Sequence, residues 1–319
     1  MKLVVDENNI TSFYNSRYDG TYMEEHTDFE LYRVQDTLNK IPISPKTILD
    51  YGCGQGGWTE LLSSVFPSAK LFGIDISDTA IDKANKRFTQ YKFYSFDGET
   101  APFEDGYFDL IFSYHVIEHV YNLEKTICDI LRLLNKNGYL CLILPCGNNN
   151  SFEERVTRLI KDGKEKFLDG RIRFFYEDIG HIRRLKSAEL INLFAEKKVR
   201  IYEEYYANHL FGSFEFICQS DTDFVKHLFD INQSVNLTAK LKLMLARLIF
   251  IPLTLNQSNL KEMIKMNRGL KRVQYTLYYP FKIISILFLK IIKLIAFLEW
   301  KFYKKYNNGS EMYLILQKI

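Results

Sequence analysis

The feature that most constrains this chain is an alternation of short apolar runs with helical patterns between residues 47 and 145. Such an alternation is typical of a parallel sheet whose crossover connections are helices. The predicted strands are 47–51, 70–74, 92–95, 108–113 and 139–144, and the predicted helices are 58–65, 78–88 and 116–134. Together they predict a doubly wound, mostly parallel α/β sheet. Its ligand crevice should lie beyond the carboxyl ends of the strands.

The remaining segments extend this core. Residues 1–45 are expected to form a helical N-terminal flap with its main helix at 29–38, and residues 46–220 form the core. A sixth strand is predicted at 199–205, and the alternating stretch 311–318, within 307–319, is predicted to be the final strand. Residues 221–306 are then a helical insertion before the last of seven strands.

Composition and cysteine usage narrow the class of protein. Hydrophobic residues make up 47% and charged residues 25% of the chain, which excludes a disordered or collagen-like protein. The five cysteines have no metal-ligand spacing, and the N-terminus lacks the apolar core of a secretory signal. A cytoplasmic location with free thiols is expected, and a disulfide between Cys141 and Cys146 is the less favoured alternative.

A glycine-rich turn follows the first predicted strand. The stretch Asp50-Tyr51-Gly52-Cys53-Gly54-Gln55-Gly56 places three glycines where a tight turn lets a ligand approach the backbone closely. The spacing is G-x-G-x-G, whereas a dinucleotide site prefers G-x-G-x-x-G. A nucleotide-like ligand is therefore predicted.

Carboxylates follow the next two strands. Asp75, with Ile76 after it, stands about 20 residues beyond the glycines, where an acid can accept hydrogen bonds from ribose hydroxyls. Asp97, with Gly98 after it, ends the third strand and could accept a hydrogen bond from an adenine amino group. Ligand-facing features at three successive strand ends indicate a site for a nucleotide-like ligand more specifically than any one of them alone.

Residues 46–200 resemble the class I S-adenosylmethionine-dependent methyltransferase family, in its small-molecule and quinone-methylating branch. Residues 50–56 are similar to its first motif, 108–120 to its fourth-strand motif, and 180–185 to a segment lining the acceptor side. Residues 131–138 resemble its turn into strand five, with Asn137-Gly138 where the family usually has two glycines. The resemblance implies a Rossmann-like methyltransferase fold and S-adenosylmethionine as cofactor. The positions expected to bind that cofactor are Asp50, Gly52, Cys53, Gly54, Gly56, Asp75, Ile76, Asp97, Gly98, Ser113 and, in the flap, Arg17.

Three histidines are candidate catalytic residues. His115 and His119 stand four residues apart, so the predicted helix puts them on one face at the mouth of the crevice. Either could act as general base for a hydroxyl acceptor, and either could instead make a structural hydrogen bond. His181 is the third candidate, beside Arg183 and Arg184, which would hold an anionic acceptor or be solvated loop charges. No third carboxylate or histidine stands at a convincing ligand spacing, so a metal is not expected.

The insertion is basic and apolar. Residues 226–306 contain fifteen Lys or Arg against three acids, a charge of +12 that leaves −9 for the rest of the chain. At 100° per residue Lys282, Lys290 and Lys293 share one helical stripe among Ile and Leu residues. This pattern predicts a helix on an anionic membrane surface, and a lid or a dimer interface is the alternative. A second apolar patch at 241–255 is expected to break at Pro252, and a nucleic-acid surface is disfavoured.

These features together predict a methyltransferase that acts on oxygen of a small-molecule, glycan or lipid-linked acceptor. The alternatives are an N- or C-methyltransferase and a cofactor-binding partner subunit without catalysis. The sequence does not define the oligomeric state.

Overall fold

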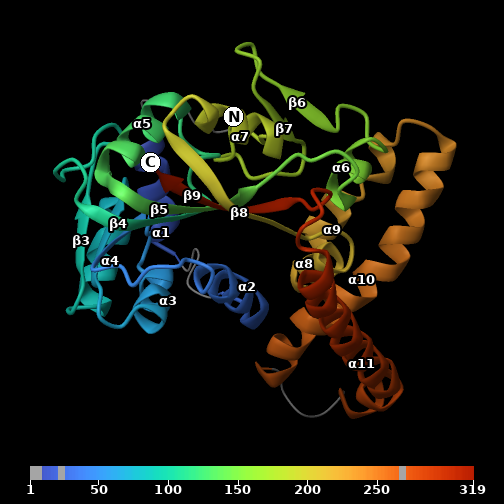
Figure 1. The fold of residues 1–319 in the computed structure, drawn as a ribbon. Coiled ribbons are helices and arrows are strands. Elements are labelled where there is room, and N and C mark those ends of the chain that lie inside the picture. Colours follow the sequence, from blue (N-terminus) through green and yellow to red (C-terminus); the bar gives the residue numbers. More distant parts are fainter. Residues whose placement is uncertain (1–8, 21–25, 266–270) are drawn as a thin grey trace. The chain divides into compact units, whose positions relative to one another are not determined.

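A seven-stranded sheet forms the centre of the fold in a computed structural model that describes residues 9–20, 26–265 and 271–319 (Figure 1). The strand order is β3-β2-β1-β4-β5-β9-β8, with parallel pairing from β3 to β5 and antiparallel pairing between β5 and β9. The strands are β1 (Thr47–Tyr51), β2 (Lys70–Asp75), β3 (Lys92–Ser95), β4 (Phe108–Tyr114), β5 (Leu134–Pro145), β8 (Val199–Ala207) and β9 (Glu311–Lys318).

Helices cover both faces of this sheet. Figure 1 shows α2, α3 and α4 on one face and α5 and α7 on the other. The helices are α1 (Ile10–Tyr18), α2 (Asp28–Leu38), α3 (Gly57–Val65), α4 (Asp78–Arg87), α5 (Leu123–Leu133) and α7 (Ser187–Ala195). The predicted fold class, a doubly wound and mostly parallel seven-stranded sheet with a helical insertion before the last strand, is confirmed.

Strand pairing brings the predicted ligand-facing loops to one edge of the sheet. Tyr51 at the end of β1 pairs with Ile74, and Asp75 at the end of β2 pairs with Ser95 at the end of β3. Because parallel strands end at the same edge, the loops after β1, β2 and β3 are neighbours there.

The segment after β4 differs from the sequence prediction. The helix predicted at 116–134 begins only at Leu123, where the side chain of Asn122 accepts a hydrogen bond from the backbone N–H of Lys125. The backbone turns at His115, whose φ is 53°, a left-handed conformation that a helix cannot continue. His115 and His119 therefore lie in a loop, and the prediction that they share a helical face is wrong.

Two compact units divide the chain, and the second contains most of the insertion. The first unit comprises Met1–Cys146, Asp178–Tyr205 and Glu311–Ile319, and the second comprises Gly147–Glu177 and Tyr206–Ser310. The second unit contains α6 (Phe152–Thr157), β6 (Lys164–Lys166), β7 (Ile172–Phe174), α8 (Phe211–Gln219), α9 (Thr222–Leu228), the 3₁₀ helix Ile231–Gln233, α10 (Leu237–Lys265) and α11 (Lys271–Tyr303).

Packing within the second unit explains two features of its sequence. Helix α10 continues through Pro252, contrary to the predicted break, with Phe250 and Leu253 on either side buried in the core of this unit. Glu299 of α11, an acid in a basic segment, accepts hydrogen bonds from the backbone N–H groups of Leu210, Phe211 and Gly212 at the start of α8. A carboxylate at that position complements the positive end of the helix dipole.

A buried charge network in the first unit links β9 to two distant segments. The carboxylate of Glu311 lies 3.2 Å from Nη1 of Arg33 in α2 and 3.1 Å from Nε2 of His115, and it accepts a hydrogen bond from the hydroxyl of Tyr313 at 2.9 Å. Burial opposes ionisation of Glu311, but Arg33 and His115 lower its pKa to about 2. The network holds the last strand against α2 and the loop after β4.

We expect Glu311→Gln to lower the free energy of unfolding by about 3 to 5 kcal/mol, because it leaves the Arg33 guanidinium buried without its counter-charge. In the parent chain, the contribution of Glu311 to the free energy of unfolding is fully present above pH 4.5. It disappears as the pH falls towards about 2, because the pKa of Glu311 in the folded state lies below its ordinary value. Urea unfolding measures both effects. Glu60→Gln, which breaks an exposed pair with Arg87, is the control and should cost less than about 1 kcal/mol; equal losses would contradict the assignment.

Candidate active site

A cavity of about 520 Å³ lies at the carboxyl edge of the sheet, within the first unit. The loops after β1, β2, β3 and β4 line it, together with α1 and the segment around His181. Its volume falls in the range of about 300 to 1,000 Å³ that is usual for small-molecule sites. The cavity therefore occupies the crevice that the strand order predicts.

The glycine turn forms one wall of the cavity. Gly52 and Gly54 have φ of 77° and 52°, conformations that side-chain-bearing residues rarely adopt. Backbone N–H groups of Gly52 and Cys53 donate to the carbonyl of Ile74 at 2.8 and 2.9 Å, which fixes the turn against β2. A Cβ on Gly54 would lie 2.6 Å from the hydroxyl of Tyr18, so α1 approaches the turn closely.

Two carboxylates stand beside this turn. Asp75 is buried and accepts hydrogen bonds at 2.9 Å from the backbone N–H groups of Gly54 and Ser77. Burial raises the pKa of Asp75, although these N–H groups oppose the shift. Asp97 is exposed to solvent, and the backbone N–H groups of Glu99 and Thr100 hold its pKa below the ordinary value. Each carboxylate oxygen keeps a lone pair for a hydroxyl or amino donor.

Two buried polar groups in the cavity wall are unsatisfied within the part of the chain that the structure describes. Among the described residues, nothing hydrogen-bonds to the hydroxyl of Tyr51 or to Nε1 of Trp58, and both side chains are buried. An unsatisfied buried donor costs about 1 to 3 kcal/mol, so a bound ligand that accepts from them would recover that cost. A cavity with acids beside a glycine turn, aromatic rings and two unused donors fits a nucleoside with a positively charged substituent.

The predicted cofactor residues divide into two groups. Those that line the cavity are Gly52, Cys53, Gly54, Asp75, Ile76, Asp97 and Gly98. The others are not among its described lining: Asp50, Gly56, Ser113 and Arg17.

The four predicted residues that do not line the cavity have other positions and contacts in the protein. Asp50 accepts a hydrogen bond from Oγ1 of Thr59 at 2.6 Å behind the turn, and burial raises its pKa to about 7. Gly56 precedes the first residue of α3 and is its N-cap. Ser113 is buried in β4. The guanidinium of Arg17 makes two hydrogen bonds to the carboxylate of Asp178, at 2.5 and 2.8 Å.

His119 faces the cavity from the loop after β4. Its Nδ1 lies 2.9 Å from the carbonyl oxygen of Gly180 and 2.7 Å from the hydroxyl of Tyr14. Because a carbonyl oxygen only accepts, we assign the proton to Nδ1, with the Tyr14 hydroxyl as a second acceptor, and the lone pair to Nε2. Burial and the neighbouring His181, whose ring centroid is 4.6 Å away, lower the pKa of His119 well below its ordinary value.

His115 and His181 also line the cavity, so the structure brings all three predicted catalytic histidines together. His115 lies between two carboxylates, with Nε2 3.1 Å from Glu311 and Nδ1 3.5 Å from Glu118. Burial alone would lower the pKa of His115, but these carboxylates raise it. Its imidazole is therefore engaged with protein groups.

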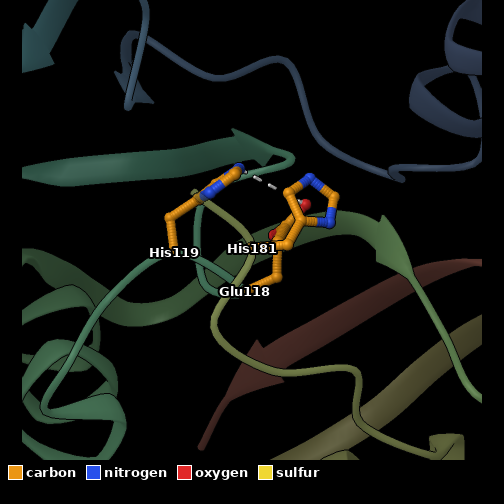
Figure 2. Close-up of side chains that lie close together, drawn as sticks. All are labelled: Glu118, His119 and His181. Atoms are coloured by element: carbon orange, nitrogen blue, oxygen red, sulfur yellow. Dashed lines mark ion pairs between the residues drawn. The ribbon is translucent and has the colours of Figure 1, made fainter. Parts of the chain in front are cut away.

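The structure gives three further side chains roles that were not predicted from the sequence. Tyr14 contacts His119, Glu118 lies beside it, and Arg183 supports the loop that carries both. Figure 2 shows Glu118, His119 and His181 gathered at one point, with the contact between Glu118 and His119 dashed. Glu118 stands three residues after His115, a spacing that could have identified it as a candidate ligand from the sequence.

A family model described as a methyltransferase domain matches residues 49–142, which include the glycine turn, Asp75, Asp97 and the histidine loop. This core is a class I S-adenosylmethionine-dependent methyltransferase domain. The chain is similar to malonyl-[acyl-carrier protein] O-methyltransferase of Legionella pneumophila, with 31% identity over 128 residues that cover 39% of this chain and 44% of that protein.

Two further relatives align with the same methyltransferase core. Trans-aconitate 2-methyltransferase of Variovorax paradoxus is 31% identical over 40% of this chain and 48% of its own length. The chloroplastic tocopherol O-methyltransferase of Arabidopsis thaliana is 29% identical over 41% of this chain and 38% of its own length. The alignments span less than half the length of these curated relatives.

Solved structures resemble the whole chain in fold alone. The [4+2]-cyclase SpnF matches with a TM-score of 0.54 and 13% identity over 99% of this chain and 97% of that one. A putative sarcosine dimethylglycine methyltransferase from Galdieria sulphuraria matches with a TM-score of 0.50 and 11% identity over 97% and 98% of the two chains. One fold thus carries proteins that are named for different reactions.

We expect Gly54→Ala to weaken binding of S-adenosylhomocysteine at least tenfold, because the new Cβ would displace Tyr18 and strain the turn. Isothermal titration calorimetry measures the affinity. Gly170→Ala is the matched control, since Gly170 also has a positive φ, of 85°, but no atom lies within 4 Å of its added Cβ. Unchanged binding by the Gly54 variant would show that the ligand does not depend on this turn.

Proposed function

We propose that this chain is an S-adenosylmethionine-dependent methyltransferase acting on an oxygen atom of a small-molecule, glycan or lipid-linked acceptor. The observation that carries the proposal is that one cavity combines the glycine turn and two acids with a lone-pair-bearing imidazole, on His119. The named O-methylating relatives support it.

Residues of the first unit would hold the cofactor in one half of the cavity. S-adenosylmethionine supplies an electrophilic methyl carbon on a positively charged sulfur. Asp75 is suited to its ribose hydroxyls, and Asp97 to its adenine amino group. The hydroxyl of Tyr51 and Nε1 of Trp58 are free to donate hydrogen bonds. By holding the two reactants close together, the cavity would lower the barrier for transfer.

In the acceptor half of the cavity, the proton of the acceptor hydroxyl has to be removed. A hydroxyl acceptor loses its proton on methylation, and Nε2 of His119 offers a lone pair in the cavity wall. We assign His181 to the same half because its ring lies against His119. His115 is assigned to orienting Glu118, since both of its nitrogens contact carboxylates.

Binding and turnover are tested separately. Thermal stabilisation by S-adenosylhomocysteine tests the cofactor site, and transfer of a labelled methyl group into lipid, sugar and protein fractions of a cell extract tests catalysis. The mass and fragmentation of the labelled product distinguish an O-methyl from an N- or C-methyl group. Cofactor binding without any labelled product would favour a non-catalytic subunit over the proposed enzyme.

We expect His119→Gln to lower kcat by about 10²- to 10⁴-fold, the usual contribution of a group that assists proton removal, with S-adenosylhomocysteine affinity within twofold of the parent chain. His227→Gln, at an exposed histidine of α9, is the control and should leave kcat unchanged. If the His119 variant turns over at the parent rate, this residue has no role in the reaction.

We further propose that α10 and α11 contact an anionic membrane surface, at the cytoplasmic face. Leu241, Leu245 and Leu248 of α10 are exposed by 57%, 59% and 72%, at helical spacings that place them on one face. Exposed residues of α11 repeat this mixture of apolar and basic side chains: Leu287, Lys290, Ile291, Lys293, Leu294 and Leu298. The side chain of Lys282 lies outside the described residues.

These exposed side chains support binding to a membrane surface and not insertion across it. Among the described residues, no helix is both long and apolar enough to cross a bilayer. Apolar residues flanked by lysines are the pattern of helices that lie in the headgroup region. The five cysteines are free thiols, which is in keeping with a reducing compartment.

We expect the chain to float with vesicles containing phosphatidylglycerol, and the triple variant Leu241→Gln, Leu245→Gln and Leu248→Gln to lose most of that binding. Leu168→Gln, at an exposed leucine outside α10 and α11, is the control and should float like the parent chain. Equal flotation of the triple variant would contradict a membrane role for this face. Loss of a dimer in the same variant, measured by light scattering, would identify a subunit interface instead.

A further inference from the structure

We propose that Glu118, His119 and His181 form a binding site for a divalent cation on the acceptor side of the cavity. The inference rests on the proposed function and specifies how the acceptor is held: His119 would assist loss of the acceptor proton through the bound cation, in place of accepting that proton itself. One potential ligand atom from each of the three side chains lies within 4.8 Å of the others (Figure 2). Two imidazoles and one carboxylate are the protein ligands of catalytic zinc sites and of non-haem iron sites.

The orientation of His119 suits a metal ligand. Its Nδ1–H donates to the carbonyl of Gly180, which leaves the lone pair of Nε2 for a cation. Metal-binding histidines usually donate their second ring N–H to a carbonyl or carboxylate in this way. Nε2 lies 4.0 Å from Oε1 of Glu118. A tetrahedral cation with bonds of about 2.1 Å needs donors about 3.4 Å apart, so the pair at 4.0 Å would have to close by about 0.6 Å and the widest pair by up to about 1.4 Å.

The backbone beneath the site is held rigidly. The guanidinium of Arg183 donates to the carbonyl oxygens of Ile117, Val120 and Tyr121, in the loop that carries Glu118 and His119. The backbone N–H of Ile182 donates to the carbonyl of Glu118 at 3.2 Å. Because Ile182 and Arg183 directly follow His181, these bonds tie together the two segments that supply the ligands. Pre-positioned ligands of this kind are what a metal site requires.

The Glu118 carboxylate also contacts a third histidine, His115. Glu118 is 1% exposed, and Nδ1 of His115 lies 3.5 Å from its Oε1. His115 is itself held by Glu311. An imidazole next to a ligand carboxylate corresponds to the outer-shell contacts that orient ligands in known metal sites.

The site is open on one side. His119 and His181 line the cavity, whereas Glu118 lies behind them, so the unused coordination positions of the cation would face the acceptor. An acceptor with a hydroxyl beside a second oxygen, such as a vicinal diol, a catechol or a hydroxy acid, would bind through both oxygens. The bound hydroxyl would pass its proton to water, and its oxygen would then form the new bond to the methyl carbon. The electrons of the broken carbon–sulfur bond would return to sulfur and leave S-adenosylhomocysteine, while the cation is unchanged.

Cation binding can be measured without turnover. We expect the tag-free chain of residues 1–319, stripped with EDTA, to bind one equivalent of Co²⁺ with a visible d–d absorption band that is lost when Zn²⁺ displaces the Co²⁺. His181→Ala and Glu118→Gln should each weaken Co²⁺ binding at least 100-fold, whereas His227→Ala should leave it unchanged. S-adenosylhomocysteine affinity and circular dichroism verify that each variant is folded. If one of the two ligand variants does not fold, the Co²⁺ binding of the other variant decides.

The outcomes separate this inference from the proposed function. No Co²⁺ binding, or equal binding by parent and both ligand variants, would overturn the cation site, since bound metal would then be adventitious. If methyl transfer nevertheless proceeds in EDTA, His119 acts directly as a base and the proposed function stands. If Co²⁺ binds at these residues while S-adenosylhomocysteine does not, the cation site stands and the methyltransferase proposal fails.

Discussion

One buried guanidinium, that of Arg183, holds the loop that carries Glu118 and His119. Residues 115–122 form neither helix nor strand, so their carbonyl groups lack the partners that regular structure provides. Arg183 satisfies three of those carbonyls from a segment about 60 residues further along the chain. The loop can therefore stay irregular without losing hydrogen bonds, and an irregular loop can turn both Glu118 and His119 towards one point. The sequence predicts that Arg183 is a solvated charge or an anion ligand, whereas its side chain is buried and bonds to backbone carbonyls.

Much of the fold could be predicted because the β/α core obeys local rules. The apolar runs at 92–95 and 311–318 are observed as β3 and β9 with the same bounds, and α2 begins one residue before its predicted start. Glycines and acids at strand ends could be assigned to one edge because parallel strands share a direction. Seven of the eleven predicted cofactor residues line the cavity for that reason.

The failures have a common physical origin in tertiary contacts. The helix predicted from 116 was based on apolar periodicity, but side-chain bonds from Arg183 offer the backbone an alternative before Leu123. Pro252 does not end α10, because burial of its neighbours outweighs one missing hydrogen bond. The Asp178 partner of Arg17, 161 residues away, has no local signature either. Sequence periodicity describes what one segment prefers alone and says nothing of such distant partners.

The position of Glu311 affects how the protein matures on the ribosome. Its partners Arg33 and His115 emerge early in synthesis, whereas the carboxylate that neutralises them is translated 196 residues after His115. Until then Arg33 and His115 lack the carboxylate of Glu311, and the edge of β5 that β9 will cover is exposed. A truncated product that ends before β9 would therefore lack its charge balance and a sheet strand together, which marks it for aggregation or proteolysis. His115, which lines the cavity, thus gains one of its two carboxylate neighbours only when the last strand has been made.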